Sequence, residues 1–476
     1  MENYDFLVIG SGSGLEVANV AANREQSVAV VEKGRLGGTC LNRGCIPSKQ
    51  LLYHADVLET VQDAGEFHVD ATVDGFDFQR IVEEVNEDVT GSSESIRKGL
   101  RSSDSHDLYD GEGRFVDERT VEISGGEHDG ARIRAETVLI AAGTRPTIPP
   151  IDGIEDVDYL TSTEALQLTS PPDHLVIVGG GYIAAELAQF FGTFGSDVTI
   201  VGRRPNLLPQ ADTEVAEAFT ERYADRFTLH TGHEATSVSQ DGGEVTVTAQ
   251  PYSYDEGGVV EDEDALEVTG DELLVAAGRR PNTDTLNLDA TGVETDEQGF
   301  VATDEYLQTD ADGIWALGDI VGEYLLKHSA NHEAQAVARN IFGSEPEPVD
   351  YTAMPFAVFG SPEVAGVGAT ESDLQADDRD YATNTYQFEN TGRGSAMHAE
   401  GFVKVLVDLE GKILGCHIVG PDASTLIQEV VVAMKAGSGS VQDIRESIHI
   451  HPALPEVVQR AFSGKFSRGG SHQHDH

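Results

Sequence analysis

Basic residues are scarce in this chain, and cysteines are scarcer still. Lysine and arginine number 31 against 83 aspartates and glutamates, which gives a formal net charge of −52 over 476 residues. A polyanion of this size repels a phosphate backbone, so we expect no nucleic-acid partner. Three cysteines are too few for a scaffold held together by disulfides.

Long apolar runs and a secretory leader are also missing. No stretch approaches the roughly 20 apolar residues that span a bilayer, so we expect no membrane partner. The N-terminus has no basic segment followed by an apolar one, and this predicts a cytoplasmic protein. Apolar residues still make up 39% of the chain. That is enough for buried cores, in about two to four domains at this length.

The acidic residues are spread over every segment instead of forming one tail. The net charge is far beyond the magnitude of about 2–8 that keeps a small domain soluble. At ~1 M salt the Debye length falls to about 3 Å, and the carboxylates repel one another much less. The composition therefore predicts the surface of a protein from a salt-loving microbe. The alternative is an acidic mesophilic protein.

A glycine-rich turn near the N-terminus stands between two predicted strands. The strands are residues 4–9 and 27–31, and the turn contains Gly10, Gly12 and Gly14. Glycine lets the backbone approach a pyrophosphate at the N-terminus of the next helix, where the helix dipole favours negative charge. Glu32 ends the second strand, where a carboxylate can accept a hydrogen bond from a ribose hydroxyl. Leu15 replaces the third glycine of the motif, so a tight turn without a nucleotide is the alternative.

The same order of elements recurs later in the chain. Predicted strands at 174–178 and 197–201 flank a turn with Gly179 and Gly181 and a helix over 182–191. The second strand of this copy leads into Arg203 and Arg204 instead of an acidic residue. Two guanidinium groups favour a nucleotide that carries a 2′-phosphate, so this fold predicts NADPH over NADH.

An apolar strand that ends in Ala-Ala-Gly closes each of these two folds. The glycines are Gly143 and Gly278, and a proline stands three residues after each. This pattern suits a crossover between domains. From about residue 346 the pattern changes to strands at 402–407 and 413–419 and a helix over 424–434, which predicts a third, α+β domain.

The strongest signal is a pair of cysteines five residues apart. Cys40 and Cys45 stand in Gly-Thr-Cys-Leu-Asn-Arg-Gly-Cys-Ile-Pro-Ser-Lys, just before a helix predicted from residue 46 onward. A helix N-terminus lowers the pKa of a nearby thiol and makes it reactive. The alternatives are a metal site and a buried pair of inert thiols, but no other cysteine is placed to complete a tetrahedral site, so we predict no metal. Cys416 lies in a predicted core strand and is interpreted as a packing residue.

The cysteine motif and the two dinucleotide folds resemble the class I pyridine nucleotide-disulfide oxidoreductases. This flavoenzyme family includes glutathione reductase, dihydrolipoyl dehydrogenase, mercuric reductase and mycothione reductase, and the resemblance extends to about residue 465. It implies an α/β fold with two Rossmann-like domains, one for FAD and one for NADPH, and a C-terminal α+β dimerisation domain. The predicted boundaries are 1–150 and 286–345 (FAD), 151–285 (NADPH), 346–466 (dimerisation) and 467–476 (disordered tail).

The resemblance also implies roles for single residues. Lys49 matches a lysine near the flavin, Glu186 its ion-pair partner, and Tyr182 the gate of the nicotinamide pocket. Asp319, in Trp-Ala-Leu-Gly-Asp, matches an acid that accepts from the ribityl chain. The predicted FAD-binding residues are Gly10, Gly12, Gly14, Glu32, Gly38, Thr39, Lys49, Gly143, Gly318 and Asp319. The predicted NADPH-binding residues are Gly179, Gly181, Tyr182, Glu186, Arg203, Arg204 and Gly278.

A second catalytic motif stands near the C-terminus, at His451-Pro-Ala-Leu-Pro-Glu456. A carboxylate five residues after a histidine can orient its imidazole for acid–base chemistry, although the motif in isolation fits a capped turn better. The resemblance implies a base contributed across a dimer interface, and therefore a homodimer with shared active sites. It also implies that Cys45 faces the flavin and that Cys40 attacks the substrate disulfide.

The resemblance defines the type of reaction more closely than it defines the substrate. The stretch 326–334 and the His451 motif look most like the mycothione reductase branch. In an extreme halophile we expect γ-glutamylcysteine as the small thiol, so bis-γ-glutamylcystine is the predicted substrate. The alternatives are mycothione or glutathione reductase, an NAD-dependent dihydrolipoyl dehydrogenase, and a flavin-bearing redox sensor without turnover. Because cations are rare, Arg97, Lys98 and Arg393 are candidates for binding substrate carboxylates.

Overall fold

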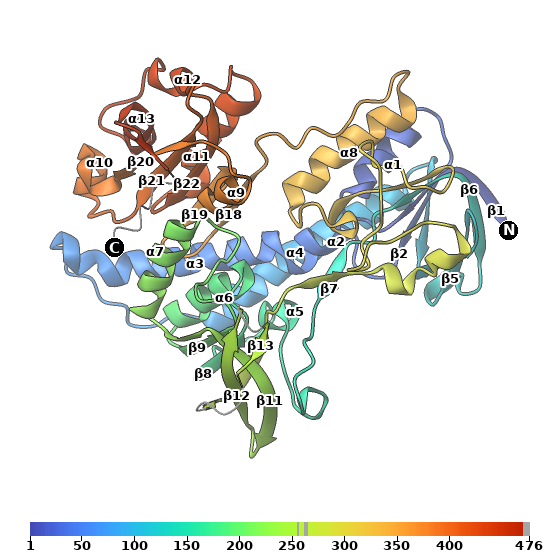
Figure 1. The fold of residues 1–476 in the computed structure, drawn as a ribbon. Coiled ribbons are helices and arrows are strands. Elements are labelled where there is room, and N and C mark those ends of the chain that lie inside the picture. Colours follow the sequence, from blue (N-terminus) through green and yellow to red (C-terminus); the bar gives the residue numbers. More distant parts are fainter. Residues whose placement is uncertain (255–256, 261–264, 470–476) are drawn as a thin grey trace.

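The computed structural model describes residues 1–254, 257–260 and 265–469. Two long helices, α3 (Cys45–Gln62) and α4 (Phe78–Arg101), run through the middle of the molecule, with one sheet-based unit at one end and two more above and below the other (Figure 1). Within the described residues, no helix is long and apolar enough to cross a membrane.

The first unit is a seven-stranded sheet in the order β3-β2-β1-β6-β5-β4, with β17 also paired to β6. Its strands are β1 (Glu2–Ile9), β2 (Val28–Glu32), β3 (His106–Asp110), β4 (Glu112–Asp117), β5 (Thr120–Ser124), β6 (Arg132–Ile140) and β17 (Ile314–Ala316). The central strands β1, β2 and β6 run parallel and are buried on both faces, which explains their continuous apolar runs. The helices α1 (Gly14–Ala22) and α8 (Lys327–Phe342) pack against each other beside this sheet (Figure 1).

The second unit contains a parallel four-stranded sheet in the order β10-β9-β8-β15. Its strands are β8 (His174–Val178), β9 (Asp197–Gly202), β10 (Thr228–Thr231) and β15 (Glu272–Val275), and its helices are α5 (Ser162–Ala165), α6 (Tyr182–Thr193) and α7 (Thr213–Ala224). An antiparallel group lies beside it, made of β11 (His233–Asp241), β12 (Glu244–Ser253), β13 (Gly258–Val259) and β14 (Leu266–Gly270). The predicted strand-turn-helix-strand order of the second copy is confirmed.

A short two-stranded sheet joins the first two units. It pairs β7 (Thr144–Pro146) with β16 (Arg279–Pro281), the two segments that follow Gly143 and Gly278. The guanidinium of Arg279 donates to the side chain and to the carbonyl of Thr144, at 2.8 and 2.9 Å. The two predicted crossovers therefore lie side by side.

The third unit is an antiparallel sheet in the order β18-β19-β22-β21-β20-β23. Its strands are β18 (Pro355–Val358), β19 (Val364–Gly368), β20 (Ala382–Gln387), β21 (Phe402–Val407), β22 (Ile413–Val419) and β23 (Ser467–Arg468). Its helices are α9 (Glu371–Ala376), α10 (Gly392–Ala396), α11 (Ala423–Lys435), α12 (Val441–Arg445) and α13 (Glu456–Ser463). Cys416 is buried in β22 as a packing residue, as expected.

One part of the predicted tail is ordered. Ser467 and Arg468 form β23, which pairs with β20. The prediction of a disordered segment from residue 467 was therefore wrong at its start, because a free sheet edge offers backbone partners that composition does not reveal. Residues 470–476 lie outside the described part of the chain.

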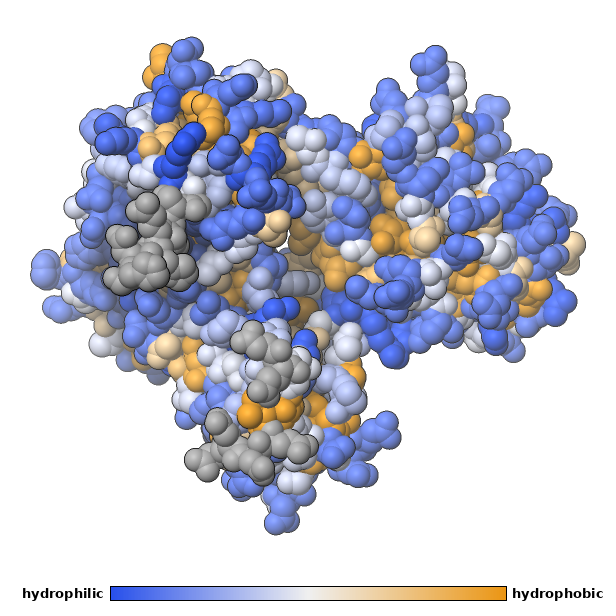
Figure 2. Space-filling view, viewed as in Figure 1, coloured by the Kyte–Doolittle hydropathy of each residue, from blue (hydrophilic) through white to orange (hydrophobic). Residues whose placement is uncertain are grey.

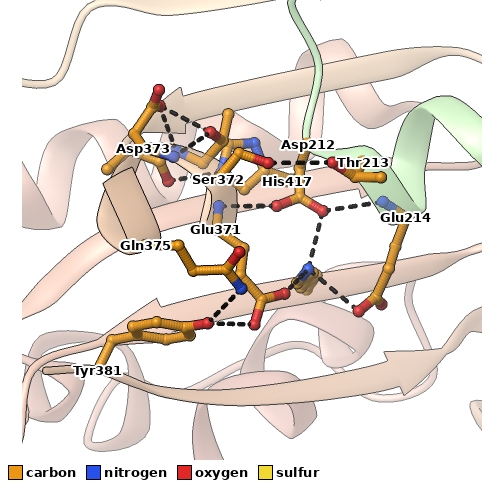
Figure 3. Close-up of polar contacts among 12 residues, drawn as sticks. Asp212, Thr213, Glu214, Glu371, Ser372, Asp373, Gln375, Tyr381 and His417 are labelled. Atoms are coloured by element: carbon orange, nitrogen blue, oxygen red, sulfur yellow. Dashed lines mark hydrogen bonds and ion pairs between the residues drawn. The ribbon is translucent and has the colours of Figure 1, made fainter. Parts of the chain in front are cut away.

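A buried ion network links the second and third units (Figure 3). The ammonium of Lys404, on β21, lies 2.9 Å from Asp212 and 2.5 Å from Glu371, and 3.2 Å from Glu214. Lys404 and Asp212 have side-chain exposures of 1% and 0%. An isolated charge in the protein interior is very costly in free energy. Lys404, Asp212 and Glu371 therefore stabilise one another only when they stay together, and the network favours one placement of the second unit relative to the third.

Hydrophilic side chains cover most of the face shown in Figure 2. Apolar side chains gather there around the central hollow between the units. The helices of the middle contribute an aromatic cluster in which Phe78 packs against Phe190, Phe191 and Phe194. This packing fixes α4 against α6 and so holds the first and second units around the hollow.

Candidate active site

A cavity of about 510 Å³ lies where the first and second units meet, and both motif cysteines line it. The glycine-rich turn after β1 forms one part of its wall, and the N-terminus of α6 forms another. The sequence-predicted residues on its wall are Gly10, Gly12, Glu32, Gly38, Thr39, Cys40, Cys45, Lys49, Gly143, Tyr182, Glu186, Gly318 and Asp319. Residues from five separate stretches of the chain are therefore brought to one chamber.

The first glycine-rich turn is shaped so that its backbone is open to the cavity. Gly10 has a φ of +102°, and a Cβ there would lie 2.2 Å from the carbonyl oxygen of Ala141. A Cβ on Gly38 would lie 2.7 Å from the Cα of Gly12, so the two backbones approach closely. Gly14 does not line the cavity; a Cβ there would meet Val8 and Ala141, so it permits helix packing.

Glu32 is held at the end of β2 by hydrogen bonds to its carboxylate. Ser11 donates to Oε2 from its backbone N–H at 3.0 Å and from its hydroxyl at 2.7 Å, and the backbone N–H of Gly34 donates to Oε1 at 2.8 Å. The carboxylate thus links the turn after β1 to the segment that follows β2. Glu32 lies on the cavity wall at the carboxyl end of a parallel strand, the edge of a sheet at which α/β folds bind ligands.

The two motif cysteines lie on consecutive helices. Cys40 belongs to α2 (Gly38–Arg43), and Cys45 is the first residue of α3, one residue before the predicted start of that helix. The two side chains lie within hydrogen-bond reach of each other. A hydrogen bond from Cys40 lowers the pKa of Cys45 to about 7, with help from the charge of Lys49. The same hydrogen bond, together with burial, raises the pKa of Cys40, so Cys45 is the more acidic thiol.

Lys49 lies one turn after Cys45 and forms an ion pair across the two units. Its Nζ lies 2.5 Å from Oε2 of Glu186, which is on α6. Glu186 is 5% exposed, and its second oxygen accepts from the backbone N–H of Phe359 at 3.1 Å. The ammonium also lies 4.9 Å from the centre of the Phe359 ring. These contacts fix a cation beside the thiol pair.

Asp319 and Tyr182 complete the middle of the cavity. Asp319 follows β17, accepts from the hydroxyl of Thr144 at 2.9 Å and lies 4.0 Å from Arg279. Tyr182, the first residue of α6, is half-buried, and burial raises the pKa of its hydroxyl to about 12. The phenol is therefore neutral at ordinary pH.

The second glycine-rich turn and its arginines lie outside this cavity. Gly179 and Gly181 connect β8 to α6, and Gly278 precedes β16. Arg203 follows β9, lies 3.3 Å from Glu234 and stacks 5.2 Å from the ring of Tyr252. Arg204 stacks 4.5 Å from the ring of Tyr254. The β12 hairpin thus places an aromatic ring against each guanidinium.

The C-terminal histidine and its carboxylate form the expected pair but do not line the cavity. His451 Nδ1 lies 2.9 Å from Oε1 of Glu456, and this hydrogen bond lowers the pKa of Glu456. The imidazole side chain is 76% exposed. Ile448 and Ile450 beside it are 100% and 78% exposed. Within one copy of the chain, the acid–base pair and the thiols are therefore apart.

Comparisons with known proteins agree with this geometry. Residues 4–337 match the model of the family described as pyridine nucleotide-disulphide oxidoreductase, and residues 354–462 match its dimerisation domain. The chain belongs to this family. Its members are disulfide oxidoreductases, and family membership implies FAD and a pyridine nucleotide as cofactors. The family and fold predicted from the sequence are confirmed, including the C-terminal dimerisation domain.

Two curated relatives span nearly the whole chain. Dihydrolipoyl dehydrogenase 3 of Haloarcula marismortui is 38% identical over 96% of this chain and 95% of its own length. Mycothione reductase of Mycobacterium tuberculosis is 36% identical over 98% of this chain and all of its own length. Among solved structures, the HOCl-induced flavoprotein disulfide reductase RclA of Escherichia coli superposes with a TM-score of 0.84 at 28% identity, covering 97% of this chain and 99% of that one.

The residues on the cavity wall fit an FAD molecule. Backbone without side chains faces the cavity at the first turn, Glu32 lies at one end, and Asp319 and Lys49 lie further along. No group of histidines, cysteines and acids suited to a metal occurs among the described residues.

Sequence reasoning named three candidate cations for substrate carboxylates and missed several cations that line this wall. Arg97 pairs with Asp110, and neither Arg97, Lys98 nor Arg393 lines the cavity. Lys327 does line it, at the start of α8. Residues 326–334 entered the sequence analysis only through the family resemblance, because the local sequence does not show that the side chain of Lys327 lies in the cavity that contains the thiols.

Proposed function

We propose that this protein is an FAD-dependent reductase that takes electrons from NADPH and reduces the disulfide of a small thiol. The observation that carries the proposal is the Cys40–Cys45 pair, placed in one cavity with the Lys49–Glu186 ion pair and a nucleotide-type turn. One NADPH and one proton convert one disulfide into two thiols and NADP⁺. Electron transfer of this kind requires a dithiol that opens and closes, which a pair of adjacent thiols provides.

The cofactor would be held by residues already described. Glu32 would accept from the ribose, Asp319 from the ribityl chain, and Lys49 would lie beside the ring. When bound, FAD supplies the step that accepts a hydride from the nicotinamide and passes an electron pair to the disulfide. Tyr182, on the nicotinamide side of the wall, would cover the ring until NADPH enters.

The thiols would then divide the work. Cys40 attacks one sulfur of the substrate disulfide and forms a mixed disulfide, which releases the first thiol. Cys45 attacks the mixed disulfide, releases the second thiol and restores the Cys40–Cys45 disulfide. Because the pKa of Cys40 is raised, this thiol needs a base to remove its proton.

We propose that His451 of the partner subunit is that base. The dimerisation domain, the exposed imidazole and the exposed apolar side chains of Ile448 and Ile450 support a homodimer that covers this surface. Glu456 of the partner subunit would orient the imidazole through the 2.9 Å hydrogen bond. After removing the proton from Cys40, the imidazole would return it to the leaving thiol.

NADPH is proposed as the electron donor because of two arginines in the second nucleotide-binding fold. Arg203 and Arg204 follow β9, where a carboxylate would select NADH. Stacking on Tyr252 and Tyr254 limits their conformations before the nucleotide binds, and this reduces the entropy lost on binding a 2′-phosphate.

For the substrate we propose bis-γ-glutamylcystine. The acidic composition favours a halophile, and the mycothione reductase similarity favours a small thiol. The test is steady-state turnover at molar KCl with purified protein. The proposal expects flavin absorbance, oxidation of NADPH faster than of NADH, and a higher kcat/KM for bis-γ-glutamylcystine than for oxidised glutathione or lipoamide. A higher kcat/KM for oxidised glutathione would overturn the proposed substrate but not the proposed disulfide reductase activity.

A second candidate function is dihydrolipoyl dehydrogenase. It is favoured by the 38% identity to the enzyme of Haloarcula marismortui. NAD⁺-dependent oxidation of dihydrolipoamide, faster than the NADPH-dependent reduction of any small disulfide, would establish it in place of the first. A protein with full flavin content and no turnover in either direction would instead be a redox sensor.

A further inference from the structure

Lys327 reaches the cavity from the first position of α8. Its ammonium donates to the hydroxyl of Ser13 at 2.6 Å and to the side-chain oxygen of Asn331. The hydroxyl of Ser13 also donates to that oxygen, at 2.9 Å. Ser13 stands directly before α1, and Asn331 lies one turn after Lys327 on α8, so the cluster joins the N-terminal ends of two helices.

The charge of this ammonium is not balanced by an acid. Two other lysines on the cavity wall, Lys33 and Lys49, each lie within 2.8 Å of a glutamate. Among the residues that the structure describes, no carboxylate lies within 4.0 Å of Lys327. Its two partners are neutral, and an ammonium has three donors, so one donor and the whole charge are available to a ligand.

The position of the ammonium relates it to the attacking sulfur. Lys327 and Cys40 line the same cavity, and the positive charge of Lys327 acts to lower the pKa of Cys40 against the larger effects that raise it. An anion bound at Lys327 would therefore lie close to the sulfur that attacks the substrate. A half-buried charge is also less screened by molar salt than one on the surface.

We propose that Lys327 binds a carboxylate of the disulfide substrate and selects acidic disulfides over neutral and cationic ones. Ser13 and Asn331 are positioning residues that hold the ammonium toward the cavity. This inference rests on the proposed reductase function, whose substrate it narrows to disulfides with a carboxylate a few bonds from sulfur. Lipoamide, whose dithiolane end carries no charge, would gain nothing from this lysine.

Three small disulfides of similar size test the proposal. They are 3,3′-dithiodipropionate, which carries two carboxylates, 2-hydroxyethyl disulfide, which is neutral, and cystamine, which carries two ammonium groups. The wild-type enzyme should reduce the dicarboxylate with the highest kcat/KM. Lys327→Gln should lower kcat/KM for the dicarboxylate by about 10- to 100-fold, mostly through KM, because a charge-assisted hydrogen bond is lost. It should change the value for the neutral disulfide by less than about 3-fold.

Two further variants sharpen the test. Lys327→Glu should reverse the order, so that cystamine becomes a better substrate than the dicarboxylate. Lys412→Gln removes an exposed lysine of the third unit and should leave all three values unchanged. Flavin content and Tm of each variant show whether it has folded.

The outcomes separate this proposal from the function on which it rests. Equal losses of kcat/KM for all three disulfides in Lys327→Gln would overturn the carboxylate site. They would show that Lys327 acts on Cys40 or on the flavin, and the reductase function would stand. If Lys327→Glu still reduced the dicarboxylate better than cystamine, this result would also overturn the carboxylate site and leave the reductase function standing. Wild-type protein that carries flavin but reduces none of the three disulfides would overturn both.

Discussion

Lys49 and Glu186 stand 137 residues apart in sequence, yet their charged groups lie 2.5 Å apart. The lysine belongs to the helix that begins at Cys45, and the glutamate belongs to the helix that follows the second glycine-rich turn. This ion pair therefore connects the thiol site of the first unit to helix α6 of the second unit. The buried glutamate fixes the lysine, and the charge of the lysine favours the thiolate of Cys45.

Replacing either motif cysteine should abolish disulfide reduction. In Cys40→Ser and Cys45→Ser we expect a loss of more than ~1,000-fold in kcat, because each removes one half of the dithiol. NADPH-dependent reduction of a small quinone needs only the flavin and should persist, which serves as the control. Cys416→Ser, at a buried packing position, should retain disulfide reduction. Full activity in Cys40→Ser would contradict the proposed mechanism.

Removing the cation beside the thiols should make Cys45 less acidic. In Lys49→Gln we expect the pKa of Cys45 to rise from about 7 toward the ordinary value of 9.0, because a positive charge that stabilises the thiolate is lost. The measurement is the rate of alkylation by iodoacetamide against pH in the reduced enzyme, with the modified cysteine identified by mass spectrometry. Lys412→Gln is the matched control. An unchanged alkylation profile would show that the charge of Lys49 does not act on Cys45.

A shared active site predicts complementation between two inactive dimers. His451→Ala should lower kcat by about 10²- to 10⁴-fold, the usual contribution of a general base. When His451→Ala and Cys40→Ser proteins are mixed under conditions that exchange subunits, each hybrid dimer contains one site with both native groups. Activity should therefore return. No recovery, with hybrids demonstrated by native mass spectrometry, would place the base and the thiols in the same subunit.

The arginines after β9 should decide the choice of nucleotide. In the double variant Arg203→Ala and Arg204→Ala we expect KM for NADPH to rise by about 10- to 100-fold and KM for NADH to change little, because only NADPH offers a phosphate to the guanidiniums. Arg222→Ala, an exposed arginine on α7, is the control in the same unit. Equal effects on both nucleotides would mean that these arginines do not read the 2′-phosphate.

The buried network around Lys404 should contribute strongly to stability. Lys404→Met leaves Asp212 and Glu371 without their cation, so we expect the free energy of unfolding to fall by about 3–5 kcal/mol. Thermal and denaturant unfolding at fixed salt measure this change, with Lys412→Met as the exposed control. A Tm equal to that of the control would show that solvent enters the network and compensates for the lost charge.

The same network has a defined dependence on pH. Burial raises the pKa of Asp212, but the charges of His417 and Lys404 outweigh burial and bring the pKa below 3.8. The stability that ionised Asp212 adds is therefore fully present above pH 3.8 and is lost as the pH falls further. Asp212→Asn should flatten the acid limb of the unfolding curve, and an unchanged acid limb would assign that limb to other carboxylates.

Local pattern was enough for most of the fold. Strands β21 and β22 begin and end at the predicted residues, because both are rich in β-branched and other apolar residues and are bounded by glycine or acidic residues. The helix after the cysteines begins one residue earlier than predicted, since Gly44 ends the preceding helix and leaves Cys45 free to start the next. Ser467 and Arg468 were assigned to a tail because their partner strand is 80 residues away in the chain.

The sequence by itself determined the two nucleotide turns, the thiol pair and the histidine–glutamate pair, since each depends on residues close together in the chain. Tertiary structure alone decided which charges have partners. Lys404 looks like any surface lysine in the sequence but is buried among three acids. Lys327 looks like one helix residue among many but lines the thiol cavity, with no carboxylate within 4.0 Å in the part of the chain that the structure describes. Whether a charged side chain is paired or buried depends on which distant segments of the chain come into contact. The packing of α3, α4, α6 and α8 around the central hollow determines those contacts.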